Sequence, residues 1–345
     1  MTTVHVTADN GCYDIYIGSV IDRAGAQIAK SGAARVLIVT DSNVAPLLLK
    51  RVKELIETEG IRTEAVILPA GEASKSEKEL FRIYEAALSA GLTRRDAFVA
   101  LGGGVIGDIC GFAAATFMRG IPFLQIPTTL LAQVDSSVGG KVAIDLPGAK
   151  NAVGAFYQPM AVLADTGTLA TLDERQLAAG MAEVIKYAAI ADASLTEHIE
   201  KRELDTIVER CCGIKAAYVA EDPYDRGRRM ELNFGHTAGH GIEIASGLKY
   251  LHGEGVAIGM GIAARAGERM GLTAPGTAQE IGRLCRMYGL PERAENIGRE
   301  AVLAAMRRDK KSDGKQINVV LIEKMGKAMA YRMTAEELLE QGKYE

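Results

Sequence analysis

The first half of the chain alternates between short apolar runs and longer stretches of mixed polarity. The apolar runs end in turn residues, as buried strands do, and they cover residues 34–41, 63–69, 96–104 and 121–129. The stretches between them space their apolar residues three and four apart, which is typical of helices, over residues 43–60, 74–92 and 105–120. This alternation predicts a parallel sheet with helices on its faces.

Two further features complete the prediction for the first half. The polar, alternating residues 1–18 predict an N-terminal pair of strands rather than a signal peptide. Ser74 or Ser76 is expected to cap the helix that follows the second strand, because a hydroxyl can accept a hydrogen bond from a first-turn N–H group.

The pattern changes near residue 171, after which helix-forming residues dominate as far as residue 309. A late strand pair is expected over residues 317–323 and 327–333, followed by a helix with a Thr334–Glu337 capping box. The predicted fold class is therefore α/β plus α. We expect a parallel-sheet α/β domain over residues 1–170 and a mostly helical domain over residues 171–345.

Composition excludes several classes of protein. Of the 345 residues, 48% are hydrophobic and 24% are charged, and the net charge of −4 with no basic face argues against a nucleic-acid partner. No run of 18 apolar residues is present, so we expect no membrane segment. The 5 cysteines are scattered and form no CxxC pair, which indicates reduced thiols and a cytoplasmic location.

The strand ends carry the signs of a nucleotide site. The sequence ALGGGVIGD, residues 100–108, joins a predicted strand to a helix, where glycines let the backbone approach a pyrophosphate. A glycine run alone could equally be a tight turn. However, the other three predicted strands also end in polar or glycine-rich residues. These are Asp41 and Asn43 after the first strand, GEASK at 71–75 after the second and PTT at 127–129 after the fourth. Ligands of parallel sheets bind at this edge, so the set favours a dinucleotide.

A second set of residues has the chemistry of a metal site. His236 and His240 lie four apart, on one face of a predicted helix, and His252 follows in a glycine-rich segment. Glu183 lies inside an apolar helix, where an unpaired carboxylate is costly, so a metal or Lys186 would explain it. Ordinary helix residues and an exposed acid are the alternatives. A catalytic zinc needs three such nitrogen and oxygen ligands, and the residues alone leave open which three.

Several cations lie in unusual surroundings. Lys141 and Lys150 are expected in a glycine-rich loop, which suits a phosphate, and Asp135 beside them could partner an ammonium or a substrate hydroxyl. Further cations could bind an anionic ligand, or could simply be solvated at the surface. They are Lys186, Lys215, Arg229, Lys310 and Lys311.

Long motifs in this order resemble one enzyme family. Five motifs are similar to those of the 3-dehydroquinate synthase family, among the sugar phosphate cyclases. They are the run from GGGVIGD to SSVGGK (residues 102–141), KNAVGAFYQP (150–159), AEVIKY (182–187), LNFGHTAGH (232–240) and LHGEGVAIGM (251–260). The resemblance covers residues 36–325 and implies an N-terminal Rossmann-like domain followed by a helical domain. Sister cyclases and metal-dependent alcohol or glycerol dehydrogenases are the alternatives. The dehydrogenases usually show GGGSxxDxxK, whereas Gly111 replaces that lysine here.

The resemblance implies an activity. The substrate would be the sugar phosphate 3-deoxy-D-arabino-heptulosonate 7-phosphate, and the products 3-dehydroquinate and phosphate, a step of the shikimate pathway. The reaction would proceed by transient oxidation by NAD, phosphate elimination, re-reduction and intramolecular aldol closure. The implied cofactors are NAD and one divalent metal, zinc or cobalt, and the implied assembly is a homodimer.

The resemblance also assigns residues by motif. The metal ligands would be Glu183, His236 and His252. The residues around NAD would be Asp41, Asn43, Glu72, Lys75, Gly103, Gly104, Asp108, Thr128, Thr129, Lys150 and Thr171. The residues around the substrate would be Asp135, Lys141, Asn151, Lys186, Lys215, Arg229, Asn233, His240 and Lys310, with Arg119 lent to the site of the neighbouring subunit.

Residues 139–151, GGKVAIDLPGAKN, depart from the commoner family pattern GGKTGVNHPLGKN. Asp145 and Leu146 replace an Asn-His pair, and Val142 replaces Thr. Both lysines of the motif are kept, so altered loop packing is expected rather than altered chemistry. Asp225 also stands where Glu is usual, four residues before Arg229.

Overall fold

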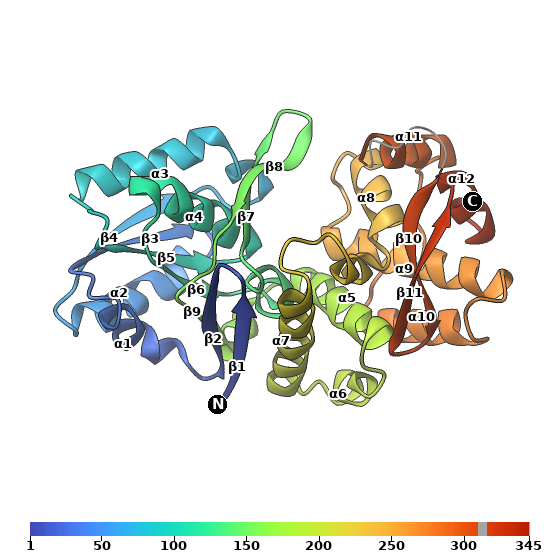
Figure 1. Cartoon of the computed structure of the whole chain (residues 1–345), viewed down its shortest axis with the longest axis horizontal. Coiled ribbons are helices and arrows are strands. Elements are labelled where there is room, and N and C mark those ends of the chain that lie inside the picture. Colours follow the sequence, from blue (N-terminus) through green and yellow to red (C-terminus); the bar gives the residue numbers. More distant parts are fainter. Residues whose placement is uncertain (310–315, 345) are drawn as a thin grey trace. The chain divides into compact units, whose positions relative to one another are not determined.

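The computed structural model describes residues 1–309 and 316–344. The described chain forms two compact units. The first contains Met1–Leu172 together with Lys215–Tyr224, and the second contains the other described residues, from Asp173 onward. Each unit is described by itself below (Figure 1).

The first unit is built on a seven-stranded sheet in the order β1-β2-β9-β6-β5-β3-β4. Its strands are β1 (Thr2–Ala8), β2 (Gly11–Gly18), β3 (Arg35–Asp41), β4 (Arg62–Leu68), β5 (Ala97–Gly102), β6 (Phe123–Pro127) and β9 (Ala161–Asp165). The pair β1–β2 is antiparallel, and every other neighbouring pair is parallel. The predicted N-terminal strand pair and parallel sheet are both confirmed.

Helices cover the two faces of this sheet, as Figure 1 shows. Their bounds are α1 (Ala24–Ala29), α2 (Lys50–Glu57), α3 (Glu77–Ser89) and α4 (Gly104–Thr116). Strand β3 is buried on both sides. Leu37 and Val39 pack in the core with α3 and α4, whereas Val36 and Ile38 pack in the core with α1 and α2. The expected cap on α3 is Ser76, whose side chain accepts a hydrogen bond from the N–H group of Glu79.

The order of the strands places the glycine-rich turn at a predictable point. From β3 the chain moves outward to β4, whereas β5 lies on the other side of β3 and leads to β6 and β9. This reversal is a topological switch point, where ligands of open α/β sheets bind, beside the carboxyl ends of the strands. Gly103 follows β5, and Asp41 ends β3.

One prediction in this unit is wrong. Lys141 and Lys150 do not lie in a loop, because they belong to a hairpin of β7 (Lys141–Leu146) and β8 (Ala149–Phe156), separate from the main sheet. Gly148, with a φ of 82°, occupies the left-handed conformation in its turn. Most of β8 is exposed, so it lacks the alternation of apolar and polar residues that marks a half-buried strand.

The second unit is mainly helical, as predicted. Its elements are α5 (Glu174–Ile190), α6 (Leu195–Lys201), the first part of α7 (Leu204–Glu221), α8 (His236–Ala245), α9 (His252–Arg269), α10 (Thr277–Met287), α11 (Arg299–Asp309), α12 (Ala335–Gln341) and the hairpin β10 (Ile317–Lys324) with β11 (Lys327–Met333). The late hairpin and the Thr334–Glu337 capping box are confirmed. Each helix of the described chain is too short or too polar to cross a bilayer.

Glycines in α9 allow two other helices of this unit, α5 and α8, to approach it closely. A Cβ atom on Gly253 would lie 2.0 Å from the carbonyl oxygen of Ala179 in α5. A Cβ atom on Gly259 would lie 1.9 Å from the carbonyl oxygen of Gly235, at the start of α8. No side chain fits such gaps, so glycine at these positions fixes the start of α9 against α5 and α8.

Candidate active site

Glu183 occupies the centre of a buried cluster in the second unit. It lies on α5, and its side chain is 1% exposed. Lys186, one turn further along, places Nζ 2.5 Å from Oε2 of Glu183. The alternative of an ordinary exposed acid is therefore wrong, because the carboxylate is buried and paired.

Two histidines approach the other oxygen of this carboxylate. Nε2 of His236 lies 3.6 Å from Oε1 of Glu183, and Nε2 of His252 lies 3.3 Å from the same atom. His236 is the first residue of α8 and His252 the first of α9. The helix packing through the glycines thus brings together three residues that are far apart in the sequence.

The second nitrogen of each ring is also held. Nδ1 of His236 lies 3.2 Å from the carbonyl oxygen of Phe234, and Nδ1 of His252 lies 3.4 Å from Oε2 of Glu243. Metal-binding histidines usually donate their remaining N–H group to a carbonyl or carboxylate in this way, which leaves Nε2 free for the ion. Glu243 was not predicted. Its only sequence signal is its position seven residues after His236, on the same face of α8.

His240 lies beside these two histidines. The ligand nitrogens of His236, His240 and His252 all lie within 4.8 Å of one another, and the three ring centroids are 5.1–5.5 Å apart. Glu183 approaches two of these histidines, His236 and His252, through a single carboxylate oxygen. A set of imidazole nitrogens with one carboxylate oxygen fits zinc or cobalt.

The two histidines nearest Glu183 differ in pKa. Burial lowers the pKa of His236 to about 3, and the Glu183 carboxylate opposes that effect only in part. Burial acts on His252 in the same direction, but hydrogen bonds to Glu183 and Glu243 outweigh it and raise its pKa to about 9. A divalent ion bound by both rings would therefore displace a proton.

A second cluster lies in the first unit, around Lys75. This residue follows β4, its side chain is 5% exposed, and Nζ lies 2.8 Å from Oδ2 of Asp108 on α4. Nζ also donates a hydrogen bond to Oδ1 of Asn151 on β8. Glu72 lies close to both lysines of the group, with Oε1 3.8 Å from Nζ of Lys75 and 3.9 Å from Nζ of Lys150. Five predicted site residues therefore meet here.

The charges of this cluster shift the pKa of two members. Burial lowers the pKa of Lys75, but the nearby Asp108 and Glu72 carboxylates outweigh it, so the pKa is raised. Burial raises the pKa of Asp108, and Lys75 offsets part of that rise. Lys75 is thus held as a cation beside the first turns of α4.

Asp135 and Lys215 form a further pair in the first unit. Nζ of Lys215 contacts Oδ1 of Asp135 and lies 2.7 Å from its carbonyl oxygen. The side chains are 19% and 8% exposed, respectively. The expectation that Asp135 partners an ammonium is confirmed, and that ammonium belongs to Lys215.

The glycine-rich turn has the form of an anion site. Gly103 precedes α4 and has no side chain to cap the first-turn N–H groups. A Cβ atom there would lie 3.0 Å from Cγ2 of Thr129, so glycine keeps the backbone of the turn close to the segment after β6. The hydroxyl of Thr128 is buried and has no hydrogen-bond partner among the described residues. These features fit a bound pyrophosphate.

The other predicted residues lie on several elements. Asp41 accepts hydrogen bonds from the N–H groups of Asn43 and Val44, so its carboxylate shapes the turn after β3. The hydroxyl of Thr171 donates to the carbonyl oxygen of Thr168.

The predicted cations differ in exposure. Arg229 is 2% exposed and, like Asn233, lies in the short helix Arg228–Asn233 just before α8. Lys141 and Arg119 are exposed. Lys310 and the rival Lys311 lie outside the described residues.

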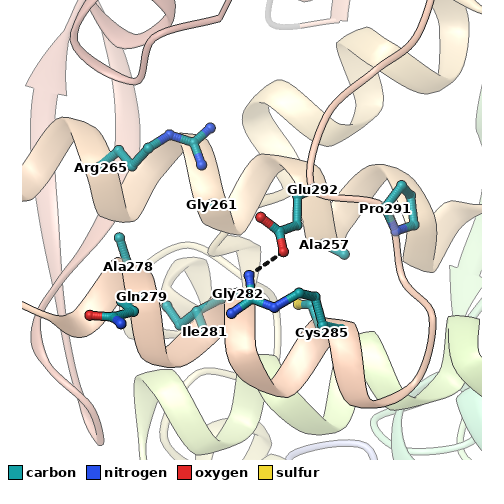
Figure 2. A pocket seen from close by; sticks show the side chains of 11 residues that line it. Ala257, Gly261, Arg265, Ala278, Gln279, Ile281, Gly282, Cys285, Pro291 and Glu292 are labelled. Atoms are coloured by element: carbon teal, nitrogen blue, oxygen red, sulfur yellow. Dashed lines mark hydrogen bonds and ion pairs between the residues drawn. The ribbon is translucent and has the colours of Figure 1, made fainter.

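A separate hollow of about 190 Å³ lies in the second unit, between α9 and α10 (Figure 2). Small residues on the two helices, Gly261 and Gly282, create the space, and an ion pair of Arg286 with Glu292 borders it. It contains none of the predicted site residues, so it is distinct from the histidine cluster.

The fold and the two clusters define a class of protein, a nucleotide- and metal-dependent enzyme with an α/β and a helical unit. Comparison with known proteins identifies the family. The family model for the 3-dehydroquinate synthase N-terminal domain matches residues 65–179, and the model for the C-terminal domain matches residues 180–312. The chain belongs to the 3-dehydroquinate synthase family, which confirms the resemblance seen in its motifs.

Individual relatives agree with this assignment. A 3-dehydroquinate synthase from Desulforamulus reducens is 44% identical over an alignment of 346 positions, which covers 96% of this chain and 96% of the relative. The crystal structure of a 2-deoxy-scyllo-inosose synthase complexed with carbaglucose-6-phosphate, NAD+ and Co2+ is 26% identical, covers 99% of each chain and has a TM-score of 0.91. A 2-epi-5-epi-valiolone synthase from Streptomyces hygroscopicus, with NAD+ and Zn2+ bound, shares the fold at 24% identity and a TM-score of 0.86 over 97% of each chain.

Proposed function

We propose that the protein is a 3-dehydroquinate synthase. It converts 3-deoxy-D-arabino-heptulosonate 7-phosphate to 3-dehydroquinate and phosphate. The observation that carries the proposal is the convergence of His236 and His252 on one oxygen of Glu183, at 3.6 and 3.3 Å, in a member of this family. A buried carboxylate with two imidazoles is a donor set for a catalytic metal rather than for a structural core.

Two cofactors belong to this proposal. A divalent metal, zinc or cobalt, supplies a Lewis acid for the substrate oxygens, and NAD supplies a hydride acceptor that each turnover regenerates. Glu183, His236 and His252 hold the metal. The uncapped start of α4, with Gly103 and Gly104, holds the pyrophosphate of NAD.

The remaining NAD residues are assigned by position. Asp41 and Asn43 lie at the end of β3, Thr128 and Thr129 at the end of β6, and Glu72, Lys75, Asp108 and Lys150 form the charged cluster beside α4. Thr171 lies in the turn after β9. This arrangement supports binding at the switch point of the sheet.

Cationic and amide side chains bind the two anionic ends of the substrate. Lys141, Asn151 and Lys310, with Arg119 of a neighbouring copy, bind the phosphate. Arg229 binds the carboxylate, because its planar fork can donate two parallel hydrogen bonds. Asn233, Asp135 and Lys215 complete the polar surroundings of the substrate.

Two residues are proposed to carry protons. His240 lies beside His236 and His252 in the histidine cluster, and the family motif assigns it to the substrate rather than to the metal. Lys186 contacts Glu183 and can exchange a proton near the metal. A positioned acid or base contributes about 10²–10⁴-fold to a rate.

The assembly and location are also proposals. We expect a homodimer in which Arg119 of each copy completes the other's phosphate site, and we expect the enzyme to work in the cytoplasm. Arg119 is exposed, as a residue that reaches towards a second copy has to be.

The test is a direct assay. The purified protein is incubated with the heptulosonate phosphate, a divalent metal and a catalytic amount of NAD. Release of phosphate and appearance of the carbocyclic product in equal amounts are expected, with no net formation of NADH. A protein that instead reduces NAD stoichiometrically with simple alcohols, and releases no phosphate, is a dehydrogenase. A panel of other sugar phosphates separates the sister cyclases.

A further inference from the structure

The hairpin β7–β8 is interrupted at Asp145. Ile144 pairs with Val153, and Leu146 pairs with Ala149, so Asp145 alone faces residues 150–152 of the opposite strand. Asn151 lies in the middle of this bulge with a φ of 51°. The left-handed conformation costs energy for a residue with a side chain, although asparagine tolerates it better than most.

Asp145 supplies contacts that hold this bulge. Its Oδ1 accepts a hydrogen bond of 2.6 Å from the N–H group of Asn151. Its own N–H group donates a hydrogen bond of 2.7 Å to the carbonyl oxygen of Lys75. One residue therefore ties the bulge to the turn after β4.

The same two partners contact each other through their side chains. Nζ of Lys75 donates to Oδ1 of Asn151, while its main ion pair is with Asp108 at 2.8 Å. Burial lowers the pKa of Lys75. Asp145 helps, behind Asp108 and Glu72, to raise it again. The carboxylate of Asp145 thus acts on Asn151 by a hydrogen bond and on Lys75 by charge.

We infer that Asp145 is a positioning residue, which fixes the backbone of Asn151 in its left-handed conformation and so orients the Asn151 amide between Lys75 and the substrate phosphate. The inference rests on the proposed function for the role of Asn151 at that phosphate.

Substitutions separate the hydrogen bond from the charge. Asp145→Asn keeps an oxygen that can accept the N–H group of Asn151 but removes the charge, whereas Asp145→Ala removes both. Asp22→Ala is the matched control, because Asp22 is an exposed carboxylate of the same unit that pairs with Arg51 at 2.7 Å.

We expect Asp145→Ala to raise the KM for the heptulosonate phosphate about tenfold, because a hydrogen bond to a charged group is lost. The change in kcat should be smaller. Asp145→Asn should stay within about twofold of the wild type, since its acceptor survives. Asp22→Ala should match the wild type. A wild-type KM in Asp145→Ala, or an equal loss in Asp22→Ala, would overturn the inference.

A second measurement does not depend on activity. Hydrogen exchange followed by mass spectrometry should show faster exchange of the amides at residues 149–152 in Asp145→Ala, with Asp145→Asn close to the wild type. If exchange in this segment is unchanged, Asp145 does not hold the bulge. If the wild type releases no phosphate from the substrate, the proposed function fails, but the exchange result still decides the role of Asp145 in orienting Asn151. Should Asp145→Ala not fold, Asp145→Thr, which suits a strand and lacks the carboxylate, replaces it with the same expected outcomes.

Discussion

At the scale of single residues, Glu183 has the most demanding position in the protein. Its carboxylate is 1% exposed, and it contacts Lys186 and two histidines. A buried charge is tolerated only when it is compensated, and here the compensation comes from an ammonium and from nitrogens that can themselves bind a cation. The same residue is thus suited to a metal site and to a stable metal-free protein.

This arrangement predicts a linked loss of metal and activity. His252→Ala and Glu183→Ala should each lose bound metal and turnover together, because a site of three protein ligands has no spare. Elemental analysis and the phosphate-release assay measure the two effects. His198→Ala is the control, since His198 pairs with Glu203 on the same unit and should change neither quantity. Full metal content and turnover in His252→Ala would remove it from the ligand set.

Glu243 gives a finer prediction about the same site. Its carboxylate is 3.4 Å from Nδ1 of His252 and is expected to fix the ring with Nε2 facing Glu183. Glu243→Gln should weaken metal affinity by about 10–100-fold, as removal of such outer contacts usually does. Competition with a chelator of known affinity measures the change. An unchanged affinity would show that the helix alone orients His252.

Some functional residues could be predicted from the sequence and others could not, and the two groups differ in the kind of contact they make. Glu183 and the histidines are visible in sequence because a carboxylate in an apolar helix, or a pair of histidines four apart, is chemically unusual. Asp145 and Glu243 are ordinary acids by local pattern. Their roles come from partners that lie elsewhere along the chain. The carboxylate of Asp145 accepts from the N–H group of Asn151, and that of Glu243 lies beside His252, so these contacts exist only after folding.

At the scale of elements, the regular pattern of the first four parallel strands made them predictable, and the irregular hairpin was missed. Strands buried on both faces, such as β3 and β5, read as continuous apolar runs. Hairpin β7–β8 contains Gly148, a bulge at Asn151 and a mostly exposed strand, so neither apolar periodicity nor turn spacing identified it. The five-residue strand β9 was also not predicted.

The packing of α9 against its neighbours is testable at this scale. Gly253→Ala places a Cβ atom 2.0 Å from the carbonyl oxygen of Ala179, which neither backbone can accommodate without moving. We expect the free energy of unfolding to fall by about 1–3 kcal/mol or more. We also expect metal to be lost, because the preceding residue is the proposed ligand His252.

Gly213 offers the matched control for that substitution. It lies inside α7, and a Cβ atom there would meet nothing within 4 Å. Gly213→Ala should therefore raise the free energy of unfolding by about 0.5–1 kcal/mol, because alanine loses less backbone entropy in a helix. Denaturant titration of both variants measures the difference. Equal effects of the two substitutions would contradict the role given to Gly253.

At the scale of the whole molecule, the family assignment and the α/β and helical character of the chain were predictable, since they rest on long motifs and on a change of periodicity. The proposed homodimer leads to a mixing experiment. Arg119→Ala and His252→Ala should each be nearly inactive alone. A purified heterodimer of the two should recover about half of the wild-type turnover. One of its two sites combines intact metal ligands from the Arg119→Ala subunit with an intact Arg119 from the His252→Ala subunit. Recovery no greater than that of the single variants would show that Arg119 serves its own subunit or none.

The order of the strands also limits how far the protein can be shortened. The family models match residues 65–312, but β3 lies between β5 and β4 and comes before that span. A fragment trimmed to residues 65–312 would lack β3, so the remainder of β4 would lose its partner and β5 would become an unprotected edge. Size-exclusion chromatography should find that fragment aggregated, because the N-terminal 64 residues supply part of the sheet interior rather than an appendage.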